Sequence, residues 1–202
     1  MNEPKKIVKF RKSGEEIKAL IVNAATKVVM ERGAARMTLA EVATEAGISK
    51  GGLLHYFSSK DDLIRAMIAA GLESFEEKTM AMVAADPTPG SYLRAYITTS
   101  FPAEGADDIA AAMIAGIASD IELFNEYSAE NTKWSDRLEK DGLDYFYAQV
   151  IRLAVDGLYF SEAIGLPQFK PKERKAFLQR LLAMTRLESP TTHEHSEPKG
   201  QP

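Results

Sequence analysis

The stretch from Thr38 to Lys60 constrains the fold more than any other part of the chain, because it encodes two short helices joined by a tight turn. Thr38 and Glu41 have the spacing of a capping box, so a helix is expected to begin directly after Thr38. Gly47 tolerates a positive φ and ends that helix, and Ser49 can cap a second one. The pattern predicts a helix-turn-helix unit.

Apolar residues recur at helical spacing in both of these segments. In the first segment they are Leu39, Val42, Ala43 and Ala46, and in the second they are Leu53, Leu54 and Phe57. Lys50, His55 and Tyr56 remain on the polar side, where they could meet phosphates and base edges. Gly51 and Gly52 would let the backbone approach another surface closely. The alternative is an ordinary helical hairpin whose polar side only faces water.

These residues resemble the DNA-binding signature of TetR-type transcriptional regulators. The resemblance rests on residues 46–53, Phe57, Ser59-Lys60 and Leu63, and covers about a quarter of the chain. It implies phosphate contacts by Thr38, Tyr56 and Lys60, with Lys50 and His55 placed to face the groove. The full expected DNA-binding set is Thr38, Ser49, Lys50, Gly51, Gly52, His55, Tyr56 and Lys60. The family often has Thr and Tyr where Gly52 and Leu54 stand, so the side-chain contacts of those two positions are not carried over.

The charge of the chain is unevenly distributed. The net charge is −4, but residues 1–60 contain eleven Lys and Arg against six Asp and Glu, whereas the remaining residues contain fourteen against twenty-three. A basic module on an acidic body suits a protein that binds a polyanion through one face. A chance fluctuation of charge is the alternative.

The rest of the chain reads as helices without strand-like alternation, so we expect an all-α fold with a three-helix DNA-binding domain and a C-terminal helical domain. Ser13 and Glu16 form another capping box at the start of the first helix. The expected helices span residues 13–32, 39–46, 50–57, 60–85, 91–101, 107–118, 121–140, 142–164 and 171–187. The expected domains are a flexible basic arm (1–12), the helix-turn-helix domain (13–60), a ligand-binding and dimerisation domain (61–187) and a disordered tail (188–202).

The last two expected helices carry more apolar surface than one neighbour can cover. This excess predicts a four-helix dimer interface with a second copy of the chain. The resemblance to TetR-type regulators also implies that these helices form the dimer seam. The expected interface residues are Phe146, Val150, Ala154, Leu158, Phe177 and Leu181.

Several kinds of chemistry have no support in the sequence. It contains no cysteine and three histidines, with His55 in the second short helix and the other two near the C-terminus. We find no Gly-rich phosphate loop and no nucleophile elbow, so neither an enzyme, a cofactor nor a metal site is expected. The N-terminus lacks an apolar signal core, and the apolar run at residues 109–118 is too short to cross a bilayer. A cytoplasmic protein without a membrane partner is expected.

These inferences together predict a homodimeric repressor that binds double-stranded operator DNA and holds a small-molecule inducer in its helical body. Large side chains that interrupt polar helices are the candidate ligand contacts, although each could be plain core. They are Tyr92, Tyr96, Met113, Phe124, Tyr127 and Trp134. Two alternatives remain. One is an all-helical small-molecule-binding or catalytic protein with an incidental helix-turn-helix, and the other is a regulator controlled by abundance or by a protein partner.

Overall fold

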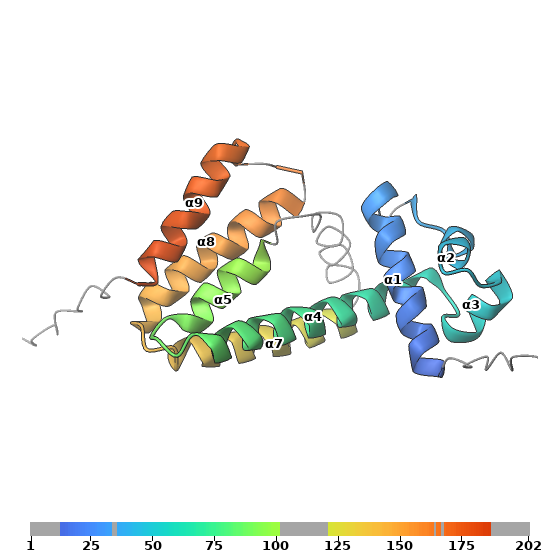
Figure 1. Ribbon diagram of the computed structural model, residues 1–202, viewed down its shortest axis with the longest axis horizontal. Coiled ribbons are helices and arrows are strands. Elements are labelled where there is room, and N and C mark those ends of the chain that lie inside the picture. Colours follow the sequence, from blue (N-terminus) through green and yellow to red (C-terminus); the bar gives the residue numbers. More distant parts are fainter. Residues whose placement is uncertain (1–12, 34–35, 102–120, 164, 167, 187–202) are drawn as a thin grey trace, which may run out of the picture. The chain divides into compact units, whose positions relative to one another are not determined.

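The computed structural model describes residues 13–33, 36–101, 121–163, 165–166 and 168–186, and each regular element in these ranges is a helix (Figure 1). The helices are α1 (Gly14–Arg32), α2 (Leu39–Glu45), α3 (Lys50–Tyr56), α4 (Lys60–Ala85), α5 (Ser91–Ser100), α7 (Ile121–Glu139), α8 (Tyr145–Ala163) and α9 (Pro171–Met184). The expected all-α fold is confirmed. The expectations for the arm, for a helix at 107–118, for Met113 and for the tail lie outside the described residues.

The chain forms two compact units. Of the described residues, the first unit contains those up to Glu73 and the second contains those from Ser74 onward. The break lies inside α4, because Leu63 and Met67 of that helix belong to the core of the first unit. One continuous helix is therefore shared by both units.

An apolar core to which α1, α2, α3 and the first part of α4 contribute holds the described part of the first unit together. Fully buried members include Ile21 and Val29 of α1, Val42 of α2, Leu53 of α3 and Leu63 of α4. α2 contacts both α1 and α3. The first helix thus completes the core of the helix-turn-helix.

Two capping boxes set the starts of α1 and α2. The Glu16 carboxylate accepts a hydrogen bond from the Ser13 backbone N at 2.6 Å, and the Ser13 hydroxyl accepts one from the Glu16 backbone N at 3.2 Å. Thr38 and Glu41 repeat this arrangement at α2. An N-cap of this kind stabilises a helix by about 1 kcal/mol. Both boxes are as the sequence predicts.

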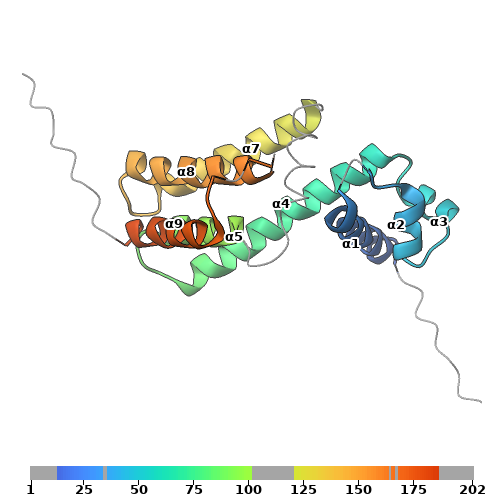
Figure 2. The same cartoon turned by 90° about the horizontal axis from the view of Figure 1, so that it is seen from above.

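Helix α5 is the centre of the second unit. Every residue from Tyr92 to Ile97 is buried. α5 contacts α7, α8 and α9, and α8 also contacts α7 (Figure 2). Because α5 is enclosed on several sides, its polar side chains must find partners inside the protein.

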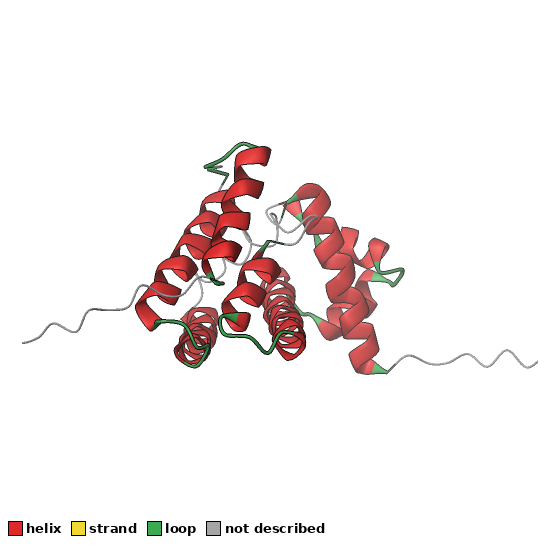
Figure 3. Cartoon of the chain, turned by 60° about the vertical axis from the view of Figure 1, so that its left-hand side comes forward, coloured by secondary structure: helices red, strands yellow, loops and turns green. Residues whose placement is uncertain are grey.

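Two expected helix boundaries were wrong by a few residues. α8 begins at Tyr145 and not at Gly142, because Gly142 has a φ of 78° and belongs to the loop between α7 and α8. Figure 3 draws the loops between the described helices in green. The Asp144 side chain then accepts a hydrogen bond from the Tyr147 backbone N at 2.8 Å. α9 ends at Met184, before the expected end at residue 187.

The first turn of α5 is capped by a side chain from a distant part of the sequence. Its own N-cap is Gly90, which has no side chain to accept a hydrogen bond. The Asp141 carboxylate, between α7 and α8, accepts hydrogen bonds from the backbone N atoms of Tyr92 at 2.8 Å and Leu93 at 2.9 Å. Burial raises the pKa of Asp141. The two hydrogen bonds favour the charged carboxylate and so oppose this effect of burial.

Arg94 of α5 joins several loops to one another. Its side chain is buried and forms an ion pair with Asp86 at 2.7 Å. The guanidinium also donates hydrogen bonds to the carbonyl oxygens of Pro89 at 2.8 Å and Thr185 at 3.2 Å, and to the Thr88 hydroxyl at 2.6 Å. Arg94 therefore fastens the turn between α4 and α5 to the end of α9.

We expect Arg94→Met to lower the free energy of unfolding of the full chain by about 3–5 kcal/mol, because it leaves buried acceptors without a donor. Urea unfolding followed by circular dichroism measures this loss. Arg180→Met is the matched control on the exposed surface of α9, where a change within about 0.5 kcal/mol is expected. A loss for Arg94→Met no larger than that of the control would show that this network is dispensable.

Candidate nucleic-acid interface and ligand site

A tight turn sets the direction of α3. Gly47 has a φ of 67°, a left-handed conformation that glycine adopts without strain. The Ile48 backbone N donates to the Ala43 carbonyl oxygen at 3.0 Å. The Ser49 hydroxyl then accepts a hydrogen bond from the Gly52 backbone N at 3.0 Å and caps α3. These contacts build the turn that the sequence predicts.

One side of α3 is packed and the other is open. Leu53 and Phe57 are buried in the core of the first unit. The exposed residues of the helix are Lys50, Gly51, Leu54 and His55. The expectation that groups Leu54 with the apolar face was wrong, because it is 41% exposed. Successive residues of an α-helix differ by about 100° in direction, so Leu54 cannot share the direction of its neighbour Leu53.

The two glycines of α3 differ in their surroundings. A Cβ atom at Gly51 would meet no atom within 4 Å, whereas one at Gly52 would lie 3.2 Å from the capping hydroxyl of Ser49. The fold therefore leaves room for a side chain at Gly51. Because glycine has no side chain, the helix backbone at Gly51 is uncovered on the exposed face.

All eight expected DNA-binding residues lie in the first unit, five of them in α3. Ser49 and Thr38 are N-caps, and Lys60 opens α4. The Thr38 hydroxyl already donates to the Glu41 carboxylate at 2.8 Å, and this bond is the main reason that the pKa of Glu41 is lowered. The half-buried Tyr56 packs edge to face against His55, with ring centroids 5.1 Å apart.

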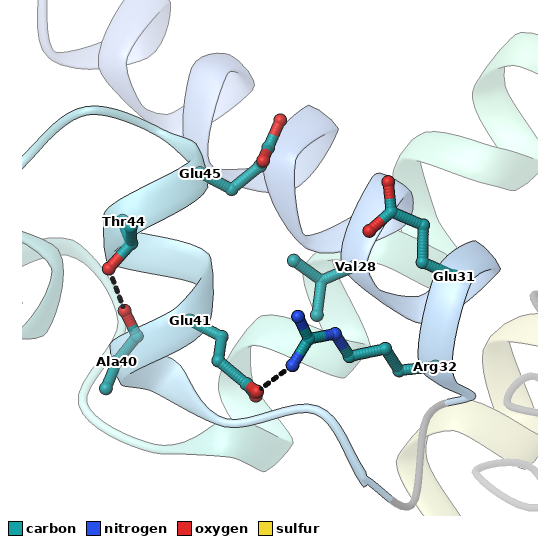
Figure 4. Close-up of a pocket in the computed structure, with 7 residues that line it drawn as sticks. All are labelled: Val28, Glu31, Arg32, Ala40, Glu41, Thr44 and Glu45. Atoms are coloured by element: carbon teal, nitrogen blue, oxygen red, sulfur yellow. Dashed lines mark hydrogen bonds and ion pairs between the residues drawn. The ribbon is translucent and has the colours of Figure 1, made fainter.

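A surface pocket of about 280 Å³ lies between α1 and α2 (Figure 4). Its lining residues are Val28, Glu31, Arg32, Ala40, Glu41, Thr44 and Glu45. Arg32 pairs with Glu41 at 2.5 Å, and Lys27 pairs with Glu45 at 2.6 Å. Because these charges are engaged with one another, the pocket is better described as a gap between two ion-paired helices than as a ligand site.

Aromatic rings gather in the second unit. Trp134 of α7 lies within 5.8 Å, centroid to centroid, of Phe75, Tyr96 and Tyr127. Tyr92 lies 6.5 Å from Tyr96. Tyr92, Tyr96 and Trp134 are buried, and burial raises the pKa of Tyr92 and Tyr127 to about 12. Four of the expected ligand residues are thus brought together.

The other two expected ligand residues are not part of this aromatic cluster. Phe124 is 49% exposed on α7, and Met113 lies outside the described residues. Phe75 of α4 joins the cluster although it is not among the expected ligand residues. Its helical spacing alone cannot distinguish a ring in a cluster from ordinary core.

A buried arginine lies against the aromatic cluster. The Arg152 guanidinium carbon is 5.8 Å from the ring centroids of both Tyr96 and Trp134. Arg152 donates to the Ser135 hydroxyl at 2.9 Å and pairs with Asp156 at 3.5 Å. The Tyr96 hydroxyl donates to Asp156 at 2.5 Å, while burial raises the pKa of that carboxyl.

Four buried side-chain atoms of the described residues have no hydrogen-bond partner. They are Thr79 Oγ1, Tyr92 Oη, Trp134 Nε1 and Arg152 Nε. The Tyr92 hydroxyl lies beside the Arg137 guanidinium without an aligned hydrogen bond. All four atoms can donate, and the tryptophan and arginine nitrogens can only donate. Arg152 Nε lies 3.5 Å from the Asp156 carboxylate, so a group with acceptor oxygens would chiefly satisfy Tyr92 Oη and Trp134 Nε1.

Helix α8 presents an open apolar face formed by Phe146, Val150 and Leu153. These side chains are 75%, 63% and 65% exposed. Ala154 and Phe177 are half-buried. Leu158 and Leu181 are buried inside the protomer, at 4% and 5% exposure, so each exposes little surface of its own.

None of the described helices combines the length and the apolarity that a membrane crossing requires. Across the same residues, the His, Asp and Glu side chains form no group of three or more that could hold a metal ion.

Transcriptional regulators of other bacteria match part of the chain. The regulator BetI of Rhizobium meliloti is 34% identical over 84 residues, which are 42% of this chain and 41% of BetI. The regulator TtgR of Pseudomonas putida is 30% identical over 76 residues, which are 38% of this chain and 36% of TtgR. The chain therefore matches about two fifths of the length of these relatives.

Solved structures match most of the chain at low identity. A transcriptional regulator from Saccharomonospora viridis in complex with choline has a TM-score of 0.70 and 15% identity, covering 84% of this chain and 96% of that one. A regulator from Rhodococcus has a TM-score of 0.68 and 20% identity, covering 83% and 95%. The likeness establishes the fold.

Two family models match successive parts of the chain. Residues 21–67 match the model of bacterial regulatory proteins of the tetR family, and residues 90–186 match the tetracycline-repressor-like C-terminal domain. The first match includes α2 and α3, and the second includes α8 and every member of the aromatic cluster except Phe75. The chain belongs to the TetR family of bacterial regulatory proteins.

Proposed function

We propose that this protein is a DNA-binding transcriptional regulator that acts as a repressor and leaves its operator when a small ligand binds. The observation that carries the proposal is the exposed face of α3. On that face the side chains of Lys50 and His55 are exposed, and no side chain covers the backbone at Gly51. The opposite side of the helix packs in the core of the first unit. A second helix held in this way is the element that enters the major groove in helix-turn-helix proteins.

Electrostatics support the same assignment. Residues 1–60, which include the helix-turn-helix, contain more basic than acidic residues, whereas the rest of the chain is acidic. Lysines that neutralise DNA phosphates displace the counterions bound to the DNA. This gives a binding affinity that does not depend on the base sequence. The acidic body limits binding to one face.

The ligand site that we propose is the aromatic cluster. Rings that bury a flat apolar molecule and a few polar groups that orient it are typical of small-molecule sites. The Tyr92 hydroxyl and Trp134 Nε1, which are buried without hydrogen bonds, favour a ligand with acceptor oxygens, such as a carboxylate or a carbonyl. Some proteins of the same fold have been crystallised with choline, with ethidium, or with isovaleryl coenzyme A and operator DNA.

Release from DNA requires that the ligand bind better to a conformation with low operator affinity. Ligand binding and DNA binding then weaken one another, because they favour different conformations of the same protein. The coupling free energy is about 1–3 kcal/mol. By linkage, bound DNA lowers the affinity for the ligand by the same factor by which bound ligand lowers the affinity for DNA.

We place the homodimer interface on the open face of α8. Phe146, Val150 and Leu153 lie one helical turn apart, and two copies of such a face form a self-complementary contact across a two-fold axis. Together with α9 this gives a four-helix arrangement. A two-fold dimer binds two half-sites, so the operator is expected to be an inverted repeat.

We expect Gly51→Ala to separate folding from DNA binding. The added methyl meets no neighbour within 4 Å, so the fold should be unchanged or more stable by up to about 1 kcal/mol, as helix propensity dictates. Affinity for operator DNA should fall by about tenfold, because the methyl holds the α3 backbone away from the groove.

Thermal unfolding and fluorescence anisotropy with labelled DNA measure these two effects of Gly51→Ala. Gly71→Ala of α4 is the matched control, since its Cβ also meets nothing within 4 Å. The control should gain similar stability and bind DNA as the wild type does. Unchanged affinity in Gly51→Ala would remove α3 from the DNA interface.

We expect Val150→Asp to produce folded monomers that bind DNA weakly. The side chain is exposed in the protomer, but in the proposed dimer the carboxylate would be buried without a partner, at a cost of several kcal/mol. Sedimentation velocity measures the oligomeric state. Met80→Asp on α4, which also replaces an exposed apolar side chain, should leave the dimer intact. A dimeric Val150→Asp protein would place the interface elsewhere.

We expect aromatic carboxylates and the matching amides to change the fluorescence of Trp134, the sole tryptophan, and to weaken operator binding. Matching benzylic ammonium compounds should do neither. Tyr92→Phe should weaken the active compounds by about tenfold, because one donor is lost, while Tyr145→Phe, an exposed tyrosine, should not.

Two results would contradict the ligand proposal. If only the ammonium compounds acted, the donor argument would be wrong. If no compound of the panel changed either signal, a regulator controlled by abundance or by a protein partner would be favoured.

A further inference from the structure

Leu54 is the one bulky side chain at the middle of the exposed face of α3. At about 100° per residue, Lys50 and His55 mark the two edges of that face, with Gly51 and Leu54 between them. Gly51 has no side chain. Any surface that docks against this face of the helix therefore contacts Leu54 at its centre.

The fold does not need this leucine for its core. Leu53 is fully buried and Phe57 is 7% exposed, so these two residues anchor α3 to the rest of the first unit. Leu54 is 41% exposed. A single exposed leucine is common on protein surfaces. The position of Leu54 is informative because it lies between Lys50 and His55, two side chains suited to DNA.

The chemistry of the major groove decides which base can meet such a side chain. Edges of guanine, cytosine and adenine present hydrogen-bond donors and acceptors, whereas thymine adds a 5-methyl group. A leucine opposite a donor or acceptor would leave that group unpaired and dehydrated, which is unfavourable. Opposite the methyl group it buries apolar surface on both sides.

We infer that Leu54 contacts the 5-methyl group of a thymine and thereby specifies thymine at one position of each operator half-site. This inference rests on the proposed DNA-binding function and goes beyond it, because it assigns base specificity to a residue whose side chain has no hydrogen-bonding atom. Lys50 and His55 then contact the phosphates and base acceptors on either side.

The test uses the duplex that the full-length wild-type protein selects from a randomised library. Each thymine of one half-site is replaced in turn by deoxyuridine, which keeps every hydrogen-bonding group and removes only the methyl. We expect one replacement to weaken binding about fourfold, the factor that corresponds to ~0.8 kcal/mol for one buried methyl-sized group. The other replacements should have little effect.

The replacement is then repeated with protein variants. Leu54→Ala should bind the thymine and deoxyuridine duplexes equally at that position, whereas Leu54→Met, which keeps an apolar side chain, should retain most of the preference. Met30→Ala removes a similarly exposed apolar side chain from α1 and should retain the full fourfold preference. Circular dichroism and thermal unfolding confirm that each variant is folded.

The outcomes separate this inference from the function on which it rests. If the wild type selects no duplex, the proposed DNA binding fails. If it selects a duplex but no deoxyuridine replacement matters, or if Leu54→Ala keeps the preference at the sensitive position, DNA binding stands and the assignment to Leu54 is overturned. Loss of the preference in Leu54→Ala alone supports it.

Discussion

The carboxylate of Asp141 and the guanidinium of Arg94 hold the second unit together, because they supply hydrogen bonds that the local sequence cannot provide. α5 begins at a glycine and would otherwise leave the N–H groups of Tyr92 and Leu93 buried without acceptors. Such groups are costly, at roughly 1–3 kcal/mol each. A Cβ atom at Gly90 would lie 2.6 Å from the Thr185 carbonyl oxygen, so a side chain that could cap α5 locally has no room. The turn before α5, the loop after α7 and the end of α9 meet around these two charges.

The two units differ in how far their sequence predicts their structure. In the first unit, local chemistry is sufficient: capping boxes at Ser13 and Thr38, a positive φ at Gly47 and apolar residues at helical spacing fix the helices and their core. In the second unit, helical spacing predicts most helices but not their partners. The contact between Asp141 and α5 joins residues far apart in the sequence, and no local pattern signals it. The burial of Leu158 inside the protomer has no local signal either, since an apolar position on a helix can face its own core or a second copy.

Pairing of polar groups also distinguishes structural positions from candidate functional ones. The charges around the pocket between α1 and α2 satisfy one another, as do Arg94 and its acceptors. By contrast, the Tyr92 hydroxyl and Trp134 Nε1 are buried without hydrogen bonds in the aromatic cluster. Protein interiors rarely leave such atoms unpaired, so their presence motivates the ligand proposal. Sequence alone could identify the aromatic residues but could not show which of their polar atoms lack partners.

The most direct test of the central claim is selection of DNA by the full-length protein from a randomised duplex pool, followed by affinity measurements at several salt concentrations. We expect enrichment of an inverted repeat whose half-sites are about one helical turn apart, and a binding affinity that falls steeply as the salt concentration rises. Absence of any enriched sequence, together with binding that does not depend on salt, would contradict the assignment of α3 to the DNA interface.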